Sequence, residues 1–163
     1  MSSQLRAIGI DPGPVPGFVE LRWAGGRLLQ RQITVAQCSA EIARPVLFAM
    51  LEEVSLDAWP TLVQIEQFVV GSRSGRSSTA AAGATTRDLV GELRAEALHY
   101  GATTVLRSAA AVKPWATDAR MEAAGLTAKV RGMRHARDAG RHALFTAVHD
   151  GRIPDPLSKE FRR

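Results

Sequence analysis

Ile8-Gly9-Ile10-Asp11-Pro12-Gly13, close to the start of the chain, is the stretch of sequence that decides the expected fold. Its apolar half predicts a buried strand, and Pro12-Gly13 predicts the turn in which that strand ends. A second apolar run, Leu62-Val63-Gln64-Ile65, ends in Glu66 and lacks alternation, which is typical of a buried parallel strand. Two strands that each end in an acid predict a pair of carboxylates at one edge of a sheet.

Each of these acids also has a purely structural interpretation. An aspartate before Pro-Gly can simply open a turn, and for Asp11 alone this explanation is as good as a functional one. Glu66 is harder to explain in this way, because burying a carboxylate away from water without a partner at the end of an apolar strand costs free energy. Its structural alternative is a salt bridge to an arginine.

The remaining patterns predict three strands in a meander, followed by alternating helices and strands. The expected strands cover residues 5–10, 18–23, 28–35, 62–65 and 103–106, and the expected helices cover residues 37–55, 79–100 and 133–149. Pro45 lies inside the first of these helices, which must therefore start late or bend. The order βββαβαβα predicts an α/β fold with a mixed five-stranded sheet flanked by helices, and it resembles the order of the RNase H-like fold.

The length of the chain, with no repeat or obvious linker, predicts one domain over residues 1–163, with residues 152–163 as a loose tail. No apolar run approaches the roughly 20 residues needed to cross a bilayer, and the first residues do not have the pattern of a signal peptide. A single cysteine, Cys38, excludes an internal disulfide and suits a reducing compartment. We therefore expect a cytoplasmic protein with neither a membrane partner nor an organic cofactor.

The net charge of +5 is concentrated in the last third of the chain. Residues 1–106 hold 9 Lys and Arg against 10 Asp and Glu, whereas residues 107–163 hold 12 basic groups against 6 acids. Such a basic region suggests a polyanionic partner such as nucleic acid, because phosphates are attracted to it over several ångströms. The alternative is a solvated arginine-rich surface without a partner.

The helix expected at 133–149 carries an imidazole and an acid three residues apart, His135 and Asp138, which point the same way. Together with Asp11 and Glu66 they predict one site for divalent metal ions. A zinc site of His135, Asp138 and His142 is a competing interpretation. It lacks cysteine ligands, and the carboxylates favour a hard ion such as Mg²⁺ or Mn²⁺.

Four motifs in order resemble those of RuvC-type Holliday-junction resolvases, over roughly residues 5–150. They are Ile8-Gly9-Ile10-Asp11-Pro12-Gly13, Gln64-Ile65-Glu66-Gln67, Val112-Lys113 and His135-Ala136-Arg137-Asp138-Ala139. The first motif alone is also similar to the opening strand of actin-like ATPases and sugar kinases, and the combination is more specific. The arginine-rich final helix is most similar to that of phage or actinobacterial members.

The resemblance implies a metal-dependent endonuclease that resolves four-way or other branched DNA junctions. Asp11, Glu66 and Asp138 would be catalytic carboxylate ligands, with His135 in the fourth position. Two metal ions about 3.5 to 4 Å apart would act on the scissile phosphate. The resemblance also implies a homodimer whose contacts involve the helix after Glu66, and it places Lys113 near the phosphate, although a surface lysine before a turn explains Lys113 equally well.

Basic residues elsewhere are expected to bind the DNA backbone. The loop at 71–78 offers Arg73 and Arg76, and the basic C-terminal region adds Lys129, Arg131 and Arg134. The family often has an aromatic residue three positions after the motif glutamate, which enters the junction. This chain has Phe68 two positions after Glu66, so alternation turns it to the other side, and strict junction selectivity is in doubt.

Two other functions remain open from the sequence. A non-catalytic DNA-binding or assembly module could keep the fold without turnover, although retaining buried acids is then costly. An actin-like phosphotransferase would share the opening strand. It is disfavoured because one copy of the fold in 163 residues cannot build a two-lobed nucleotide cleft, and because Ala24-Gly25-Gly26 is too short for a second phosphate loop.

Overall fold

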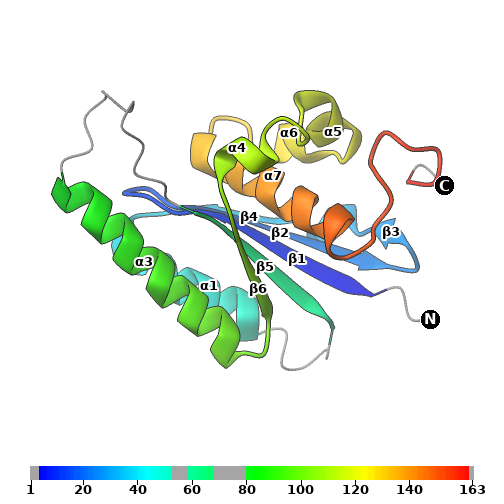
Figure 1. Ribbon diagram of the computed structural model, residues 1–163. Helices are drawn as coiled ribbons and strands as arrows, with labels where there is room; N and C mark the ends of the chain where they lie inside the picture. Colours follow the sequence, from blue (N-terminus) through cyan, green and yellow to red (C-terminus); the bar gives the residue numbers. More distant parts are fainter. Residues whose placement is uncertain (1–3, 53–58, 68–79, 162–163) are drawn as a thin grey trace.

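A mixed sheet runs through the middle of the computed structural model, which describes residues 4–52, 59–67 and 80–161 (Figure 1). Six strands form it: β1 Leu5–Asp11, β2 Gly17–Ala24, β3 Arg27–Leu28, β4 Thr34–Gln37, β5 Thr61–Glu66 and β6 Thr103–Arg107. Their order is β3-β2-β1-β5-β6, with β4 also paired to β2. The pairs β1–β2, β2–β3 and β2–β4 are antiparallel, and β1–β5 and β5–β6 are parallel. The predicted mixed sheet is confirmed.

The expected third strand, residues 28–35, is broken in two. The 3-10 turn η1 (Gln30–Gln32) separates β3 from β4, and both pieces pair with β2. Gln30 Nε2 donates a hydrogen bond of 3.0 Å to the carbonyl of Ala124, which ties the break to the far side of the chain. This tertiary contact has no counterpart in the strand pattern, so the sequence does not predict the break.

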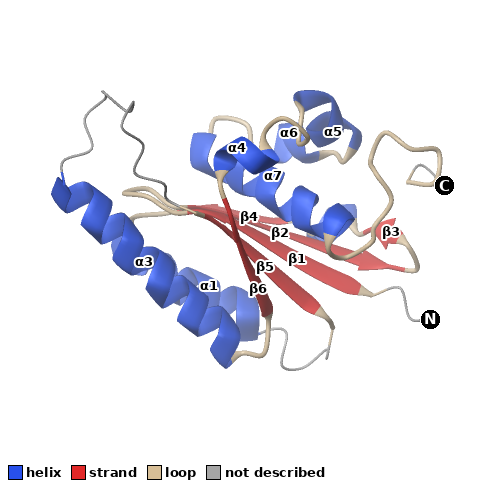
Figure 2. Ribbon diagram, viewed as in Figure 1, coloured by secondary structure: helices blue, strands red, loops and turns tan. Residues whose placement is uncertain are grey.

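Helices cover both faces of the sheet (Figure 2). One face carries α1 (Ala43–Glu52), which follows the 3-10 turn η2 (Ala40–Ile42), and α3 (Ala80–His99). The other carries α7 (Arg134–His149) together with the short helices α4 (Ala109–Val112), α5 (Asp118–Ala123) and α6 (Leu126–Lys129). Pro45 lies in the first turn of α1, where a missing N–H costs nothing, so the predicted late start is confirmed.

Helix α7 lies directly against β1 and β2 because two glycines leave room for its backbone. A Cβ atom at Gly9 would overlap the carbonyl of Ala139 and the amide of Ala143, and one at Gly17 would overlap the backbone of His135 and Ala136. The helix contributes small residues to this contact, among them Ala136, Ala139, Ala143 and Ala147, all fully buried. The close approach brings the first turn of α7 to the end of β1.

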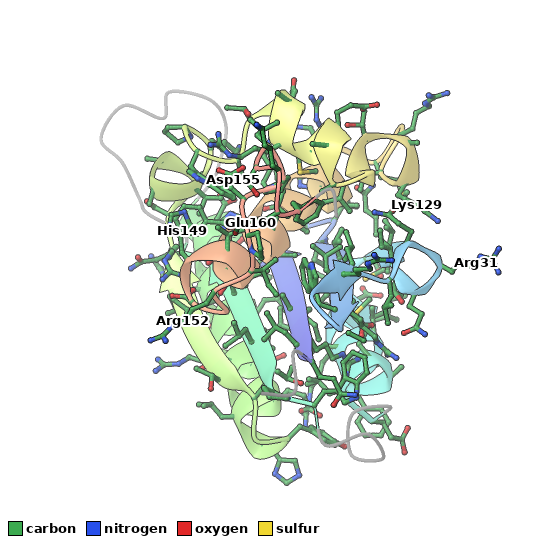
Figure 3. The ribbon with its side chains drawn as sticks, turned by 90° about the vertical axis from the view of Figure 1, so that its right-hand side faces the viewer. Arg31, Lys129, His149, Arg152, Asp155 and Glu160 are labelled. Carbon is green, nitrogen blue, oxygen red and sulfur yellow. The ribbon has the colours of Figure 1, made fainter. Side chains whose placement is uncertain are left out.

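The expected loose tail is packed on the body over its described residues. Ile153 is 9% exposed, and Phe161 packs against the core on the α7 side of the sheet. Asp155 accepts from Arg120 Nε at 2.9 Å and from Nη2 at 2.8 Å. Burial alone would raise the pKa of Asp155, but the hydrogen bonds from Arg120 and the Leu157 amide and the charge of Arg120 hold it below its usual value. The charge of His149, which lies near Asp155 in Figure 3, adds to this effect. These contacts join residues of the described part of the tail to the body of the protein.

A buried ion pair joins β1 to β2 on the other face of the sheet. Arg6 is 2% exposed and Glu20 is 1% exposed, and their side chains are bonded to each other. Arg22 also donates to Glu20, and Arg6 donates to the carbonyl of Met50 in α1. In the part of the chain that the structure describes, no helix is both long and apolar enough to cross a membrane.

Candidate active site

Asp11 and Glu66 end neighbouring parallel strands. Asp11 is the last residue of β1, Glu66 is the last of β5, and the register pairs Ile10 with Ile65 directly before them. Both carboxylates therefore lie at the same edge of the sheet, as predicted. Asp11 is 9% exposed, and the side chain of Glu66 is 23% exposed.

The first turn of α7 adds the imidazole of His135. Its Nδ1 lies 2.8 Å from Oδ2 of Asp11. The turn is held in place by Gln37, the last residue of β4, whose Oε1 accepts from the amides of His135 at 3.1 Å and Ala136 at 3.4 Å. Gln37 thus satisfies two of the amides that a helix start leaves unpaired. No pattern in the sequence points to this role.

Three carboxylates interact at this edge. Burial raises the pKa of Asp11, the negative charges of Glu66 and Asp138 raise it further, and the hydrogen bond and charge of His135 oppose the rise. Glu66 and Asp138 are thus close enough to affect the protonation of Asp11. The fold brings together all four residues singled out in the sequence.

Asp138 is paired with two cations. Its Oδ2 accepts from Lys113 Nζ at 3.0 Å, and its Oδ1 accepts from Arg141 Nη1 at 2.6 Å. Burial alone would raise the pKa of Asp138, but the hydrogen bonds and charges of Lys113 and Arg141 outweigh it and hold that pKa below its usual value. Arg141 also donates to Asp118 at 2.8 Å. The sequence singled out Lys113 but not the role of Arg141.

Glu66 is paired with a histidine that the sequence assigned only to the competing zinc site. Oε2 of Glu66 lies 3.0 Å from Nε2 of His142, and Nδ1 of His142 lies 2.7 Å from Nε2 of Gln64. His142 is fully buried against β5. It therefore faces Glu66 and Gln64, and it is not turned toward His135 and Asp138 as a zinc site would require.

The donor set suits a hard divalent cation by its chemistry, although the side chains are turned to other partners. Asp11, Glu66 and Asp138 supply carboxylate oxygens, which Mg²⁺ and Mn²⁺ prefer. Within the described residues, no three His, Cys, Asp or Glu side chains are placed so that they could hold one ion. Asp138 is instead paired with Lys113 and Arg141, Glu66 with His142, and Asp11 with His135.

The basic residues expected to bind DNA fall into three groups. Lys113 lies at the site, where it forms an ion pair with Asp138. Arg131 and Arg134 line a hollow of about 430 Å³ beside the start of α7, together with Arg137 and the apolar side chains of Met121, Val130 and Met133. Lys129 is exposed at the end of α6 (Figure 3). Arg73, Arg76 and Phe68 lie outside the described residues.

Comparison with known proteins identifies the fold. No protein-family model matches the chain, and no curated protein does. Two of the solved structures that are similar to it match along nearly their whole length. RuvC of T. thermophilus in complex with a Holliday junction substrate is 18% identical, covers 91% of this chain and 96% of its own, and has a TM-score of 0.62. A second T. thermophilus RuvC structure is 21% identical, with a TM-score of 0.55. The match covers 90% of this chain and 96% of that one. The chain therefore has the RNase H-like fold of RuvC, as its ordered motifs predict.

Proposed function

We propose that this protein is a metal-dependent, structure-selective endonuclease that nicks branched DNA, with four-way junctions as its substrate class. One observation carries the proposal: Asp11, Glu66, His135 and Asp138, spread over the whole chain, lie together at one edge of a sheet with the fold of RuvC. One of the similar RuvC structures holds a Holliday junction substrate. The basic C-terminal third of the chain supplies the charge that such a substrate requires.

Asp11, Glu66 and Asp138, with His135, are the proposed ligands of two Mg²⁺ or Mn²⁺ ions. Two metal ions bound in such a site would activate a water molecule and neutralise the charge on the leaving oxygen. Burial and neighbouring acids make the negative charge on Asp11 unfavourable. A cation at this position would relieve that cost, which is a physical reason for this protein to bind metal.

Lys113 has a second role in the proposal, as a partner of the scissile phosphate. In the structure its ammonium donates to Asp138 at 3.0 Å. When Asp138 turns toward a cation, the same ammonium is released within reach of the substrate backbone. Arg131 and Arg134, beside the start of α7, would position the adjacent phosphates.

We also propose that the active form is a homodimer, since resolving a junction needs two opposed cuts. Exposed apolar side chains on α1 and α3 support this, Phe48 (38%) and Leu98 (52%), together with Ile42 (50%) directly before α1. Light scattering after gel filtration measures the mass directly. A monomer at the concentration that cuts junctions would contradict the dimer and leave the nuclease proposal standing.

The test is cleavage of a labelled four-way junction with Mg²⁺ and with Mn²⁺, beside plain duplex and a flap of the same sequence. We expect symmetric nicks in the junction, no cutting in EDTA, and no cutting by Asp11→Asn or Glu66→Gln. Both variants should keep or increase DNA affinity, because each removes a negative charge near the phosphates. Wild-type turnover in either variant would show that the substituted residue is not a ligand.

A DNA-binding module without turnover is the second candidate, and one observation favours it. Lys113 and Arg141 already neutralise Asp138, and no three-ligand group is formed in the described part of the chain. On this alternative the protein would bind junctions and no divalent ion would produce nicks. Calorimetry with Mn²⁺ separates the two functions before any DNA is added.

A further inference from the structure

A continuous line of hydrogen bonds connects the carboxylate of Glu66 to Arg107, the last residue of the neighbouring strand β6, and to Asp150 at the end of α7. His142 Nε2 lies 3.0 Å from Glu66 Oε2, and His142 Nδ1 lies 2.7 Å from Gln64 Nε2. Gln64 Oε1 accepts from Arg107 Nη1 at 2.7 Å. Arg107 is held in turn by Asp150, which accepts from Nη1 at 2.7 Å and from Nη2 at 2.8 Å.

Arg107 fixes which group donates and which accepts in each of these hydrogen bonds. A guanidinium can only donate, so the oxygen of the Gln64 amide must face Arg107 and its NH₂ must face His142. The NH₂ group can only donate as well, so Nδ1 of His142 is an acceptor and carries no proton. The ring proton is then on Nε2 and is donated to Glu66, whose oxygen accepts it.

We propose that His142 is a positioning residue for Glu66, set in the Nε2–H tautomer by Arg107 through Gln64. The inference rests on the proposed nuclease function, because it assigns this line of residues to the support of a metal-binding carboxylate. His142 orients the Glu66 carboxylate by donating to Oε2, which leaves Oε1 for a cation. Metal-binding carboxylates depend on such hydrogen bonds from outside the ligand set.

The identities of Gln64 and His142 are better explained by positioning of the Glu66 carboxylate than by packing of the core. Gln64 and His142 are both fully buried, and α7 otherwise meets the sheet through alanines and other apolar side chains. A polar pair in such a place is costly unless every polar atom is satisfied, and here the polar pair ends on Glu66. A neutral imidazole also leaves the full negative charge on Glu66, whereas an arginine there would compete with a divalent ion.

The tautomer is measured first, in the metal-free protein, from the ¹⁵N chemical shifts of the His142 ring. We expect a proton on Nε2 and none on Nδ1 at neutral pH. Gln64→Glu replaces the donor that faces Nδ1 with an acceptor, so this variant should become protonated at Nδ1. A wild-type ring with its proton on Nδ1, or a Gln64→Glu ring without one there, would overturn the assignment whatever the activity.

Two substitutions of His142 then test positioning. A Gln side chain can place its amide NH₂ near the position of imidazole Nε2, whereas an Asn side chain reaches only the position of Nδ1. His142→Asn should weaken Mn²⁺ binding, measured by calorimetry without DNA, by about 10- to 100-fold, and His142→Gln should restore most of it. His149→Asn, on the same helix but exposed, is the matched control and should bind as wild type does.

The outcomes separate this inference from the proposed function. A wild-type protein that binds Mn²⁺ and nicks junctions, beside a folded His142→Asn variant that equals it in both, would overturn the positioning role alone. A wild-type protein that neither binds Mn²⁺ nor nicks would overturn the nuclease proposal, and the positioning role with it. Melting curves of each variant show whether it is folded.

Discussion

Nδ1 of His135 lies 2.8 Å from Oδ2 of Asp11, a contact that joins the first turn of α7 to the last residue of β1 across 124 positions of the chain. The hydrogen bond and charge of the imidazole favour the ionised form of Asp11, but burial and two neighbouring acids oppose it more strongly. The ionised form of Asp11 is therefore less favourable in the folded protein than in water. This balance gives the first prediction.

Asp11→Asn should abolish cleavage and raise the melting temperature of the metal-free protein at neutral pH. The pKa of Asp11 is raised above its ordinary value of 3.8, so the folded state binds the proton more tightly than the unfolded state does. The stability that Asp11 contributes is present below pH 3.8 and is lost as the pH rises through the raised pKa. Because the substituted asparagine cannot ionise, the variant does not lose this stability as the pH rises.

Scanning calorimetry in EDTA between pH 4 and pH 8 measures this effect. The difference in melting temperature between Asp11→Asn and the wild type should grow with pH. Saturating Mg²⁺ should then stabilise the wild type more than the variant, because only the wild type gains a ligand. A variant that is less stable than the wild type at pH 8 in EDTA would contradict the prediction.

Lys113→Met should change how stability depends on pH through Asp138. The pKa of this aspartate is lowered, so its contribution is present above pH 3.8 and is lost as the pH falls through its folded pKa. Removing Lys113 leaves only Arg141 to oppose burial, so the pKa should rise and the contribution should shrink. Direct titration of the Asp138 carboxyl by NMR checks the direction, and an unchanged pKa would show that Lys113 has little influence there.

Gly9→Ala should destabilise the protein and misplace the site. The added methyl would overlap the backbone of α7 at Ala139 and Ala143, which cannot move like a flexible side chain. Overpacking of this kind costs roughly 1 to 3 kcal/mol, or more against rigid backbone. Gly91→Ala in α3 is the control. Its methyl meets open space, and alanine favours a helix over glycine by about 1 kcal/mol. Urea unfolding of both variants should therefore give shifts of opposite sign.

Glu20→Leu should be among the most destabilising substitutions that leave the site untouched. It removes the carboxylate that is bonded to Arg6, whose side chain is 2% exposed and would lose this ion pair inside the protein. Breaking a buried pair in this way costs about 3 to 5 kcal/mol. Arg44→Ala breaks an ion pair with Glu96 in which the arginine is 63% exposed, so its effect on the free energy of unfolding should be much smaller. Equal effects in the two variants would contradict the prediction.

Arg131→Ala and Arg134→Ala should weaken DNA binding nearly equally for all sequences and flatten its dependence on salt. Each lost phosphate contact lowers the slope of log K against log salt by roughly one. The same loss is expected for Arg73→Ala and Arg76→Ala. Arg94→Ala, on α3 and across the sheet from α7, should keep the wild-type slope. An unchanged slope in Arg134→Ala would show that the start of α7 does not contact the backbone.

The sequence alone determined the order of the elements and the residues that end them. Apolar runs bounded by Pro and Gly placed β1 and β5 to within a residue or two, and the acids at their ends followed. Parallel neighbours meet at the same edge of a sheet, so the meeting of Asp11 and Glu66 needed only local patterns and one topological rule. These features depend on contacts that repeat along each element, which is why they can be predicted.

Only the tertiary structure decided what each of these side chains faces. The competing zinc site needed His135 and His142 to face one ion, yet the first lies at the edge of the sheet against Asp11 and the second is buried against Glu66. The rotation of the helix about its axis makes that distinction, and it is set by the contact at Gly9 and by Gln37. The same holds for Lys113 and Arg141 on Asp138. Such pairings join residues far apart in the chain at single points, and a single contact leaves no periodic trace in a sequence.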